Sequence, residues 1–77
     1  MGKLDGQVAI ITGGARGIGE GICKIFCNEG ATVALWDILD EGQNTADRIK
    51  KEGGKIMFQK VDVTDQSSVN VAVEKLI

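Results

Sequence analysis

Residues 11–19 read Ile11-Thr12-Gly13-Gly14-Ala15-Arg16-Gly17-Ile18-Gly19, a glycine-rich segment between an apolar run and an amphipathic one. The apolar run, Val8–Thr12, is typical of a fully buried β-strand. The amphipathic run over 17–29 is typical of a helix. A turn of this kind directs backbone N–H groups outward at the start of a helix, where the helix dipole favours a phosphate. The segment therefore predicts an anion-binding loop.

The three spaced glycines of this loop have different expected roles. Gly13 permits a tight turn, Gly17 lets the backbone approach a pyrophosphate, and Gly19 lets the helix pack closely on the strand. Their spacing, G-x-x-x-G-x-G, differs from the commoner G-x-G-x-x-G fingerprint, and no Lys-Ser/Thr pair follows as in a P-loop. A loop that only makes a tight turn remains the alternative explanation.

The rest of the chain repeats the strand-then-helix pattern. We expect strands at 8–12, 32–36 and 56–61, and helices at 17–29, 40–51 and 66–77. Strands that alternate with helices of this length indicate right-handed crossovers and an α/β fold with a parallel sheet. Gly30 is expected to end the first helix, and Asp65 to cap the last. The expected inward positions of the helices are Ile18, Ile22, Ile25 and Phe26, then Ala46 and Ile49, then Val69, Ala72, Val73 and Leu76.

Asp37 is the second informative position. It stands at the end of the second expected strand, 18 residues after Gly19. An acidic residue about 20 residues beyond the glycines is placed to hydrogen-bond a ribose diol. The alternative is a helix-capping or turn residue, but Asp40 and Glu41 stand closer to the next helix and fit that role better.

Composition excludes several classes of function. The net charge is −2, without the positive excess that nucleic-acid binding requires. The apolar run Val8–Ile11 is far too short to span a membrane. The 77 residues include no His and no Tyr, which excludes a Ser-His-Asp triad or a tyrosine acid within them.

The two cysteines, Cys23 and Cys27, are four residues apart in the first expected helix. A metal site would need two further ligands, and the sequence has neither a His nor a third Cys. We therefore expect no metal, two reduced and packed thiols, and a cytoplasmic protein.

Residues 12–19 resemble the T-G-x-x-x-G-I-G cofactor motif of the short-chain dehydrogenase/reductase family. The resemblance continues through Gly30-Ala31-Thr32-Val33 and Asp62-Val63-Thr64. It implies an NAD-dependent oxidoreductase that transfers a hydride between nicotinamide and a small carbonyl or secondary alcohol, like a 3-oxoacyl reductase or an alcohol dehydrogenase. It also implies a Rossmann-type parallel sheet, of which this sequence holds the first βαβαβα half only. The catalytic Ser and Tyr-x-x-x-Lys of the family are absent, so we expect no catalytic residue here and no activity from the chain alone.

The same resemblance assigns roles to individual residues. Asp62 would hydrogen-bond the adenine amino group with the Val63 amide beside it, Ile18 would offer its amide to the pyrophosphate, and Thr12 would brace the loop. Arg16 is placed like the basic residue that NADP users direct at the 2′-phosphate, whereas Asp37 would oppose that phosphate. We expect Asp37 to prevail, and NAD to be the cofactor. The predicted cofactor-binding residues are thus Gly13, Arg16, Gly17, Ile18, Gly19, Asp37, Asp62 and Val63.

A different class of function stays open. Half of a doubly wound sheet leaves Val8–Thr12 at an open edge, where a second copy could pair. The chain would then be a stand-alone nucleotide-binding module without catalysis. On either interpretation we expect a homo-oligomer.

Overall fold

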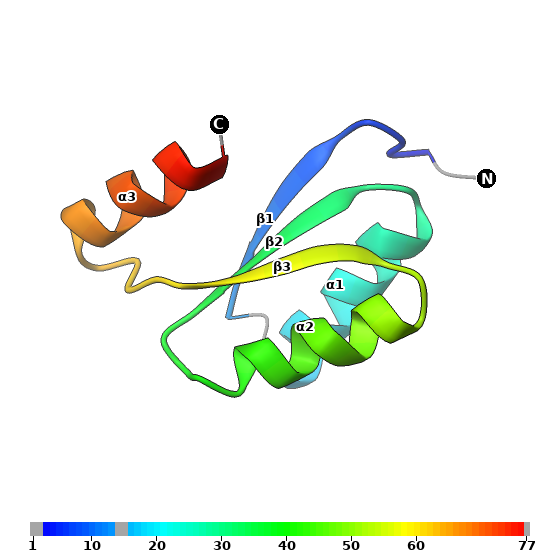
Figure 1. The fold of residues 1–77 in the computed structure, drawn as a ribbon, viewed down its shortest axis with the longest axis horizontal. Helices are drawn as coiled ribbons and strands as arrows, with labels where there is room; N and C mark the ends of the chain where they lie inside the picture. Colours follow the sequence, from blue (N-terminus) through cyan, green and yellow to red (C-terminus); the bar gives the residue numbers. More distant parts are fainter. Residues whose placement is uncertain (1–2, 14–15, 77) are drawn as a thin grey trace.

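The computed structural model describes residues 3–13 and 16–76, and Figure 1 shows the fold. Three strands and three helices alternate along the chain: β1 (Val8–Thr12), α1 (Gly17–Asn28), β2 (Thr32–Asp37), α2 (Gly42–Lys51), β3 (Lys55–Lys60) and α3 (Gln66–Leu76). The strands form one parallel sheet in the order β1-β2-β3. This confirms the α/β class and the parallel sheet. Gly14, Ala15 and Ile77, which the sequence placed in the loop and the last helix, lie outside the described residues.

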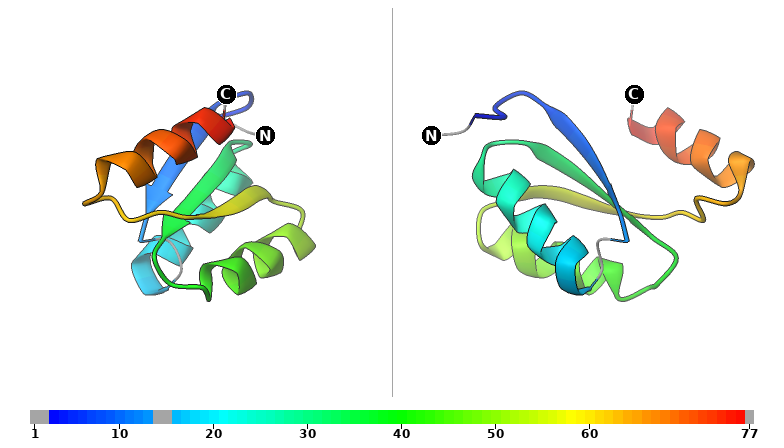
Figure 2. Two further views of the ribbon diagram at one scale, coloured as in Figure 1. Left: turned by 60° about the vertical axis from the view of Figure 1, so that its left-hand side comes forward. Right: turned by 180° about the vertical axis from the view of Figure 1, so that it is seen from behind.

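The helices cover the two faces of the sheet unequally. Figures 1 and 2 show α1 and α2 side by side on one face and α3 alone on the other. Strand β2 supplies both cores because its side chains alternate between the faces. Val33 and Leu35 are buried with residues of α1 and α2, whereas Ala34 and Trp36 are buried with Val61 and Ala72. The result is a three-layer arrangement centred on β2.

Strand β1 is not fully buried, contrary to the prediction from its apolar sequence. Val8 is 63% exposed and Ile10 is 43% exposed. Ala9 and Ile11 pack against the core beside α1 and α2, so Val8 and Ile10 point to the opposite face of the sheet, where the buried core of the described residues includes no residue of β1. The four apolar residues have the composition of a central strand, but β1 lies at an edge of the described sheet.

The inward face of α1 is also different from the expected one. The buried residue is Cys23, with Phe26 and Cys27 packed against the same core. Ile18 and Ile25, which were expected to point inward, are 85% and 61% exposed. The sheet covers only the side of α1 that carries Cys23. The isoleucines of α1 therefore face outward, including Ile22, which is partly exposed.

The starts of α2 and α3 differ in how they are capped. Helix α2 begins at Gly42 rather than at residue 40, and the side chain of Glu41, its N-cap, makes no capping hydrogen bond. The prediction that Asp65 caps α3 is confirmed, because its Oδ1 accepts the Ser67 N–H at 2.9 Å. In α3, Ala72 is buried as expected, but Val73 is 36% exposed.

Candidate dinucleotide-binding site

The carboxyl ends of the three strands border one crevice. Its volume is about 260 Å³, and its lining consists of Thr12, Gly13, Trp36, Asp37, Ile38, Val61, Asp62, Val63 and Thr64. Four of the predicted cofactor residues are thus brought together: Gly13, Asp37, Asp62 and Val63. The crevice lies where ligands bind in open α/β sheets, outside the carboxyl ends of parallel strands.

The other four predicted residues, Arg16 to Gly19, form the first turn of α1 and its N-cap rather than the crevice lining. Gly13 and Gly17 have φ angles of +67° and +54°, and a Cβ on either would meet no atom within 4 Å. These glycines therefore border open space in a backbone conformation that other residues rarely adopt. The first N–H groups of a helix lack partners inside the helix, so the turn at Ile18 can offer donors to that space.

The carboxylate of Asp37 is held at the end of β2. Its Oδ1 accepts the N–H of Leu39 at 3.1 Å, and the residue is half-buried. Ile38, between the two, is 58% exposed and forms an apolar wall of the crevice. An anionic acceptor beside an apolar wall suits a ribose with a base stacked next to it.

The carboxylate of Asp62 is oriented by its own turn. Thr64 donates both its N–H, at 2.9 Å, and its hydroxyl, at 2.6 Å, to Oδ1 of Asp62. These two hydrogen bonds favour the charged form and hold the pKa of Asp62 below its usual value. The Asp62 N–H donates to Oγ of Ser68 at 3.1 Å, which ties the turn to α3. Asp62 is therefore an ionised acceptor of fixed orientation at neutral pH.

Arg16 makes a contact that the sequence did not reveal. Its Nε and Nη2 both contact Oε1 of Glu41, the N-cap residue of α2. The hydrogen bond and charge of Glu41 raise the pKa of Arg16 above its usual value, and the charge of Asp37 adds to this. The contact therefore joins the loop that follows β1 to the loop that follows β2.

Sequence reasoning did not assign Ile38 and Thr64 to the crevice, and it did not reveal that Glu41 contacts Arg16. A Thr two residues after an Asp is a known turn signal and could have identified Thr64. Ile38 follows the acidic residue directly, but an exposed apolar residue has no pattern to mark it. The contact of Glu41 joins positions 25 residues apart, which no local pattern predicts.

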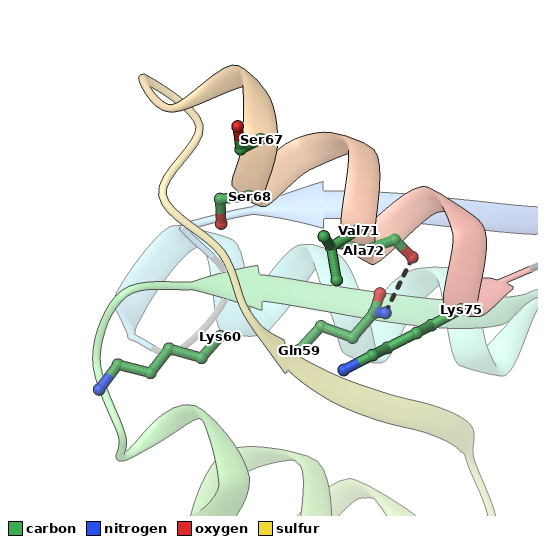
Figure 3. Close-up of a pocket in the computed structure, with 7 residues that line it drawn as sticks. All are labelled: Gln59, Lys60, Ser67, Ser68, Val71, Ala72 and Lys75. Atoms are coloured by element: carbon green, nitrogen blue, oxygen red, sulfur yellow. Dashed lines mark hydrogen bonds between the residues drawn. The ribbon is translucent and has the colours of Figure 1, made fainter.

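Ser68, which accepts the hydrogen bond from the Asp62 N–H, also lines a second cavity. Its volume is about 310 Å³, and it opens between β3 and α3 (Figure 3). Its lining is Gln59, Lys60, Ser67, Ser68, Val71, Ala72 and Lys75. Lys60 forms an ion pair with Asp40 at 3.0 Å, and Gln59 donates to the carbonyl of Ala72. None of the predicted cofactor residues lines this cavity.

Three further findings concern metal ligands, thiols and membrane-spanning helices. Over residues 3–13 and 16–76, no group of three or more His, Cys, Asp or Glu side chains could hold a metal ion. Both cysteines are free thiols, with Cys23 buried and Cys27 half-buried. In the same described part of the chain, no helix is both long and apolar enough to cross a membrane.

Known proteins match this chain closely over its whole length. Residues 7–77 match the family model for short chain dehydrogenases. Oxidoreductase UcpA of Salmonella typhimurium is 45% identical over 97% of the chain. The 3-oxoacyl-[acyl-carrier-protein] reductase FabG of Chlamydia muridarum is 42% identical over 96%, and the cyclopentanol dehydrogenase of a Comamonas species is 37% identical over 100%. The chain spans only 28–31% of the length of these relatives.

Solved structures give the same result. The citronellol catabolism dehydrogenase AtuB of Pseudomonas aeruginosa matches 99% of the chain with a TM-score of 0.90 and 31% identity. A protein of Beutenbergia cavernae, solved with bound NADP at low occupancy, matches 95% with a TM-score of 0.83 and 32% identity. The chain covers 33% and 29% of these two structures. Taken with the crevice at the strand ends and the glycine loop beside it, these matches show that the chain belongs to the short-chain dehydrogenase/reductase family.

Proposed function

We propose that this chain is the adenosine-binding part of an NAD-dependent oxidoreductase of the cytoplasm, acting on a small carbonyl compound or secondary alcohol. The observation that carries the proposal is the meeting of Asp37 and Asp62 in one crevice at the strand ends. The open space beside Gly13 and Gly17 suits the approach of a pyrophosphate, so the residues present fit a dinucleotide.

Each of these residues has a distinct task in binding. Asp37 accepts hydrogen bonds from the ribose hydroxyls, and Asp62, oriented by Thr64, accepts from the adenine amino group. The N–H at Ile18 donates to the pyrophosphate at the start of α1. When bound, the nicotinamide supplies or accepts the hydride, and these residues only hold the other end of the molecule.

The preference for NAD over NADP follows from the charge of Asp37. A 2′-phosphate would lie beside this carboxylate, and each pair of like unit charges ~4 Å apart costs about 4 kcal/mol at an effective dielectric of ~20. Solvent lowers this cost because the residue is half-buried. We expect the remaining penalty to favour NAD by about one to two orders of magnitude in affinity, or roughly 1.4–2.8 kcal/mol.

The test compares Asp37→Ser with the wild-type chain in NADH and NADPH binding, followed by ligand fluorescence. The variant should bind NADPH more tightly and NADH more weakly. Asp47→Ser is the matched control, since Asp47 is an exposed carboxylate on α2 that pairs with Gln43. An unchanged ratio of the two affinities in Asp37→Ser would contradict the assignment of Asp37 and of NAD.

The class of substrate rests on the relatives rather than on the crevice. Their names include a 3-oxoacyl reductase and a cyclopentanol dehydrogenase, both of which act on a carbonyl or an alcohol. The 77 residues contain no Tyr, and general acid–base catalysis is typically worth 10²–10⁴ in rate. We therefore propose that this chain alone is inactive. Turnover of NADH with a 3-oxoacyl or cyclic ketone substrate, above a denatured control, would overturn this.

A further inference from the structure

We propose that Glu41 is a specificity-determining residue of the cofactor site, which acts by withholding Arg16 from a 2′-phosphate. This inference rests on the proposed dinucleotide function. Asp37 already disfavours NADP through its charge. Glu41 would disfavour NADP further, although it does not line the crevice.

The geometry joins the first turns of two neighbouring helices. Arg16 is the N-cap of α1 and Glu41 is the N-cap of α2, and each uses its backbone rather than its side chain in that position. The side chain of Glu41 is thereby available for Arg16, whose Nε and Nη2 both contact its Oε1 at 2.5 Å. Two guanidinium donors are thus occupied by one carboxylate oxygen.

Arg16 and Glu41 both follow residues of the crevice closely in the sequence. Arg16 stands three residues after Gly13 and Glu41 stands four residues after Asp37, and both Gly13 and Asp37 line the crevice. A phosphate bound beside Asp37 would therefore lie next to the loops that carry the Arg16–Glu41 pair. With Arg16 engaged, such a phosphate meets two carboxylates, Asp37 and Glu41, whose charges exceed the single charge of the arginine.

The size of the effect follows from exposure. The side chains of Arg16 and Glu41 are 70% and 41% exposed, and ion pairs in such surroundings change an equilibrium by about two- to five-fold. A phosphate must displace Glu41 to use Arg16, and it is also repelled by the charge of Glu41. Removal of that charge should therefore raise the affinity for a 2′-phosphate by about three- to ten-fold.

The experiment uses the full chain, with 2′,5′-ADP and 5′-ADP as probes, and measures binding by calorimetry or by NMR titration. Both probes contain only the adenosine end of a dinucleotide, so they require no nicotinamide pocket. Glu41→Gln should bind 2′,5′-ADP three- to ten-fold more tightly than the wild type does, while its affinity for 5′-ADP changes less than two-fold. The unchanged affinity for 5′-ADP also shows that the variant is folded.

Asp40→Asn is the matched control. It also removes one negative charge, at the residue next to Glu41, but the Asp40 carboxylate pairs with Lys60 and not with Arg16. Its effect on 2′,5′-ADP should be smaller than that of Glu41→Gln. In the Arg16→Gln background, Glu41→Gln should lose most of its effect, as a double-mutant cycle requires of two residues that act together.

Three results would overturn the inference. The first is an unchanged affinity of Glu41→Gln for 2′,5′-ADP while 5′-ADP still binds. The second is an equal gain in Asp40→Asn, and the third is a full gain that persists without Arg16. If the wild-type chain binds neither probe, the proposed function itself fails. This result differs from the other three, in which 5′-ADP still binds and only the role of Glu41 is refuted.

Discussion

The indole N–H of Trp36 donates a hydrogen bond of 2.7 Å to Oε1 of Gln59, inside the layer between the sheet and α3. Gln59 in turn donates its Nε2 to the carbonyl oxygen of Ala72 at 3.0 Å (Figure 3). One side chain therefore joins β2, β3 and α3. Gln59 is 8% exposed and Trp36 is 5% exposed, so water cannot readily replace either hydrogen bond.

Replacement of Gln59 by Leu should therefore be strongly destabilising. It leaves the Trp36 N–H and the Ala72 carbonyl buried without this partner, at about 1–3 kcal/mol for each such group. We expect the free energy of unfolding to fall by roughly 2–3 kcal/mol, measured by urea denaturation. Gln43→Leu, at an exposed position on α2, is the control and should change stability by less than about 0.5 kcal/mol. Equal stability of the two variants would contradict this role for Gln59.

A pair of glycines gives a second prediction, in which the same substitution has opposite effects. A Cβ on Gly42 would lie 2.3 Å from Cε1 of Phe58, so Gly42→Ala must displace the Phe58 ring or the start of α2. We expect it to cost about 1–3 kcal/mol. On Gly21, inside α1, a Cβ meets nothing within 4 Å. Gly21→Ala should therefore stabilise the chain by about 0.5–1 kcal/mol through helix propensity, and thermal unfolding followed by circular dichroism would show both shifts.

The raised pKa of the Cys23 thiol predicts how the free energy of unfolding depends on pH. Its burial, and to a lesser extent the neighbouring Cys27 and Glu20, raise the pKa of Cys23 from 9.0 to about 11. Between these values the folded chain keeps the proton while the unfolded chain loses it, so unfolding becomes more favourable as the pH rises. The full contribution is present below pH 9, and it falls by at most about 1.4 kcal/mol per pH unit above that.

Urea denaturation at several pH values from 8 to about 10.5 measures this slope. Cys23→Ala is less stable at every pH because it leaves a cavity, but its stability should decline less steeply above pH 9. The two proteins differ only at residue 23, so the difference between their slopes reports on Cys23. Parallel curves for the two proteins would mean that Cys23 does not titrate as its burial implies.

The parts of the fold that are encoded locally could be predicted from the sequence. The alternation of strands and helices, the cap at Asp65 and the glycine loop all depend on residues close together in the chain. The parallel sheet follows from that alternation. The prediction was wrong where burial depends on what lies next to an element. Ile10 and Ile25 have the pattern of core residues, yet they are 43% and 61% exposed.

The candidate site could likewise be predicted only in part. Gly13, Asp37 and Asp62 could be placed together because parallel strands bring their carboxyl ends to one edge. The orientation of their side chains could not be predicted. Asp62 is held by Thr64, which is local, but Arg16 is engaged by Glu41 through a contact between two loops that only the packing of α1 beside α2 creates.

The uncovered edge of β1 leads to the last prediction. One side of this strand has N–H and C=O groups that no strand pairs within the described residues, and Val8 and Ile10 are exposed beside them. Such an edge is a template for pairing with another chain. In a complete doubly wound sheet a fourth strand would pair there, so we expect the 77-residue chain by itself to pair with a second copy instead.

Sedimentation velocity across a dilution series should therefore show a dimer or larger assembly that dissociates at low concentration. Ile10→Lys places a charge on the exposed side of this strand and should weaken the assembly, since charged side chains at an edge oppose pairing. Val71→Lys is the control, because Val71 is 50% exposed but lies on α3 beside β3, at the opposite edge of the sheet. A chain that stays monomeric and cooperatively folded at high concentration would refute the prediction, and so would equal weakening by both substitutions.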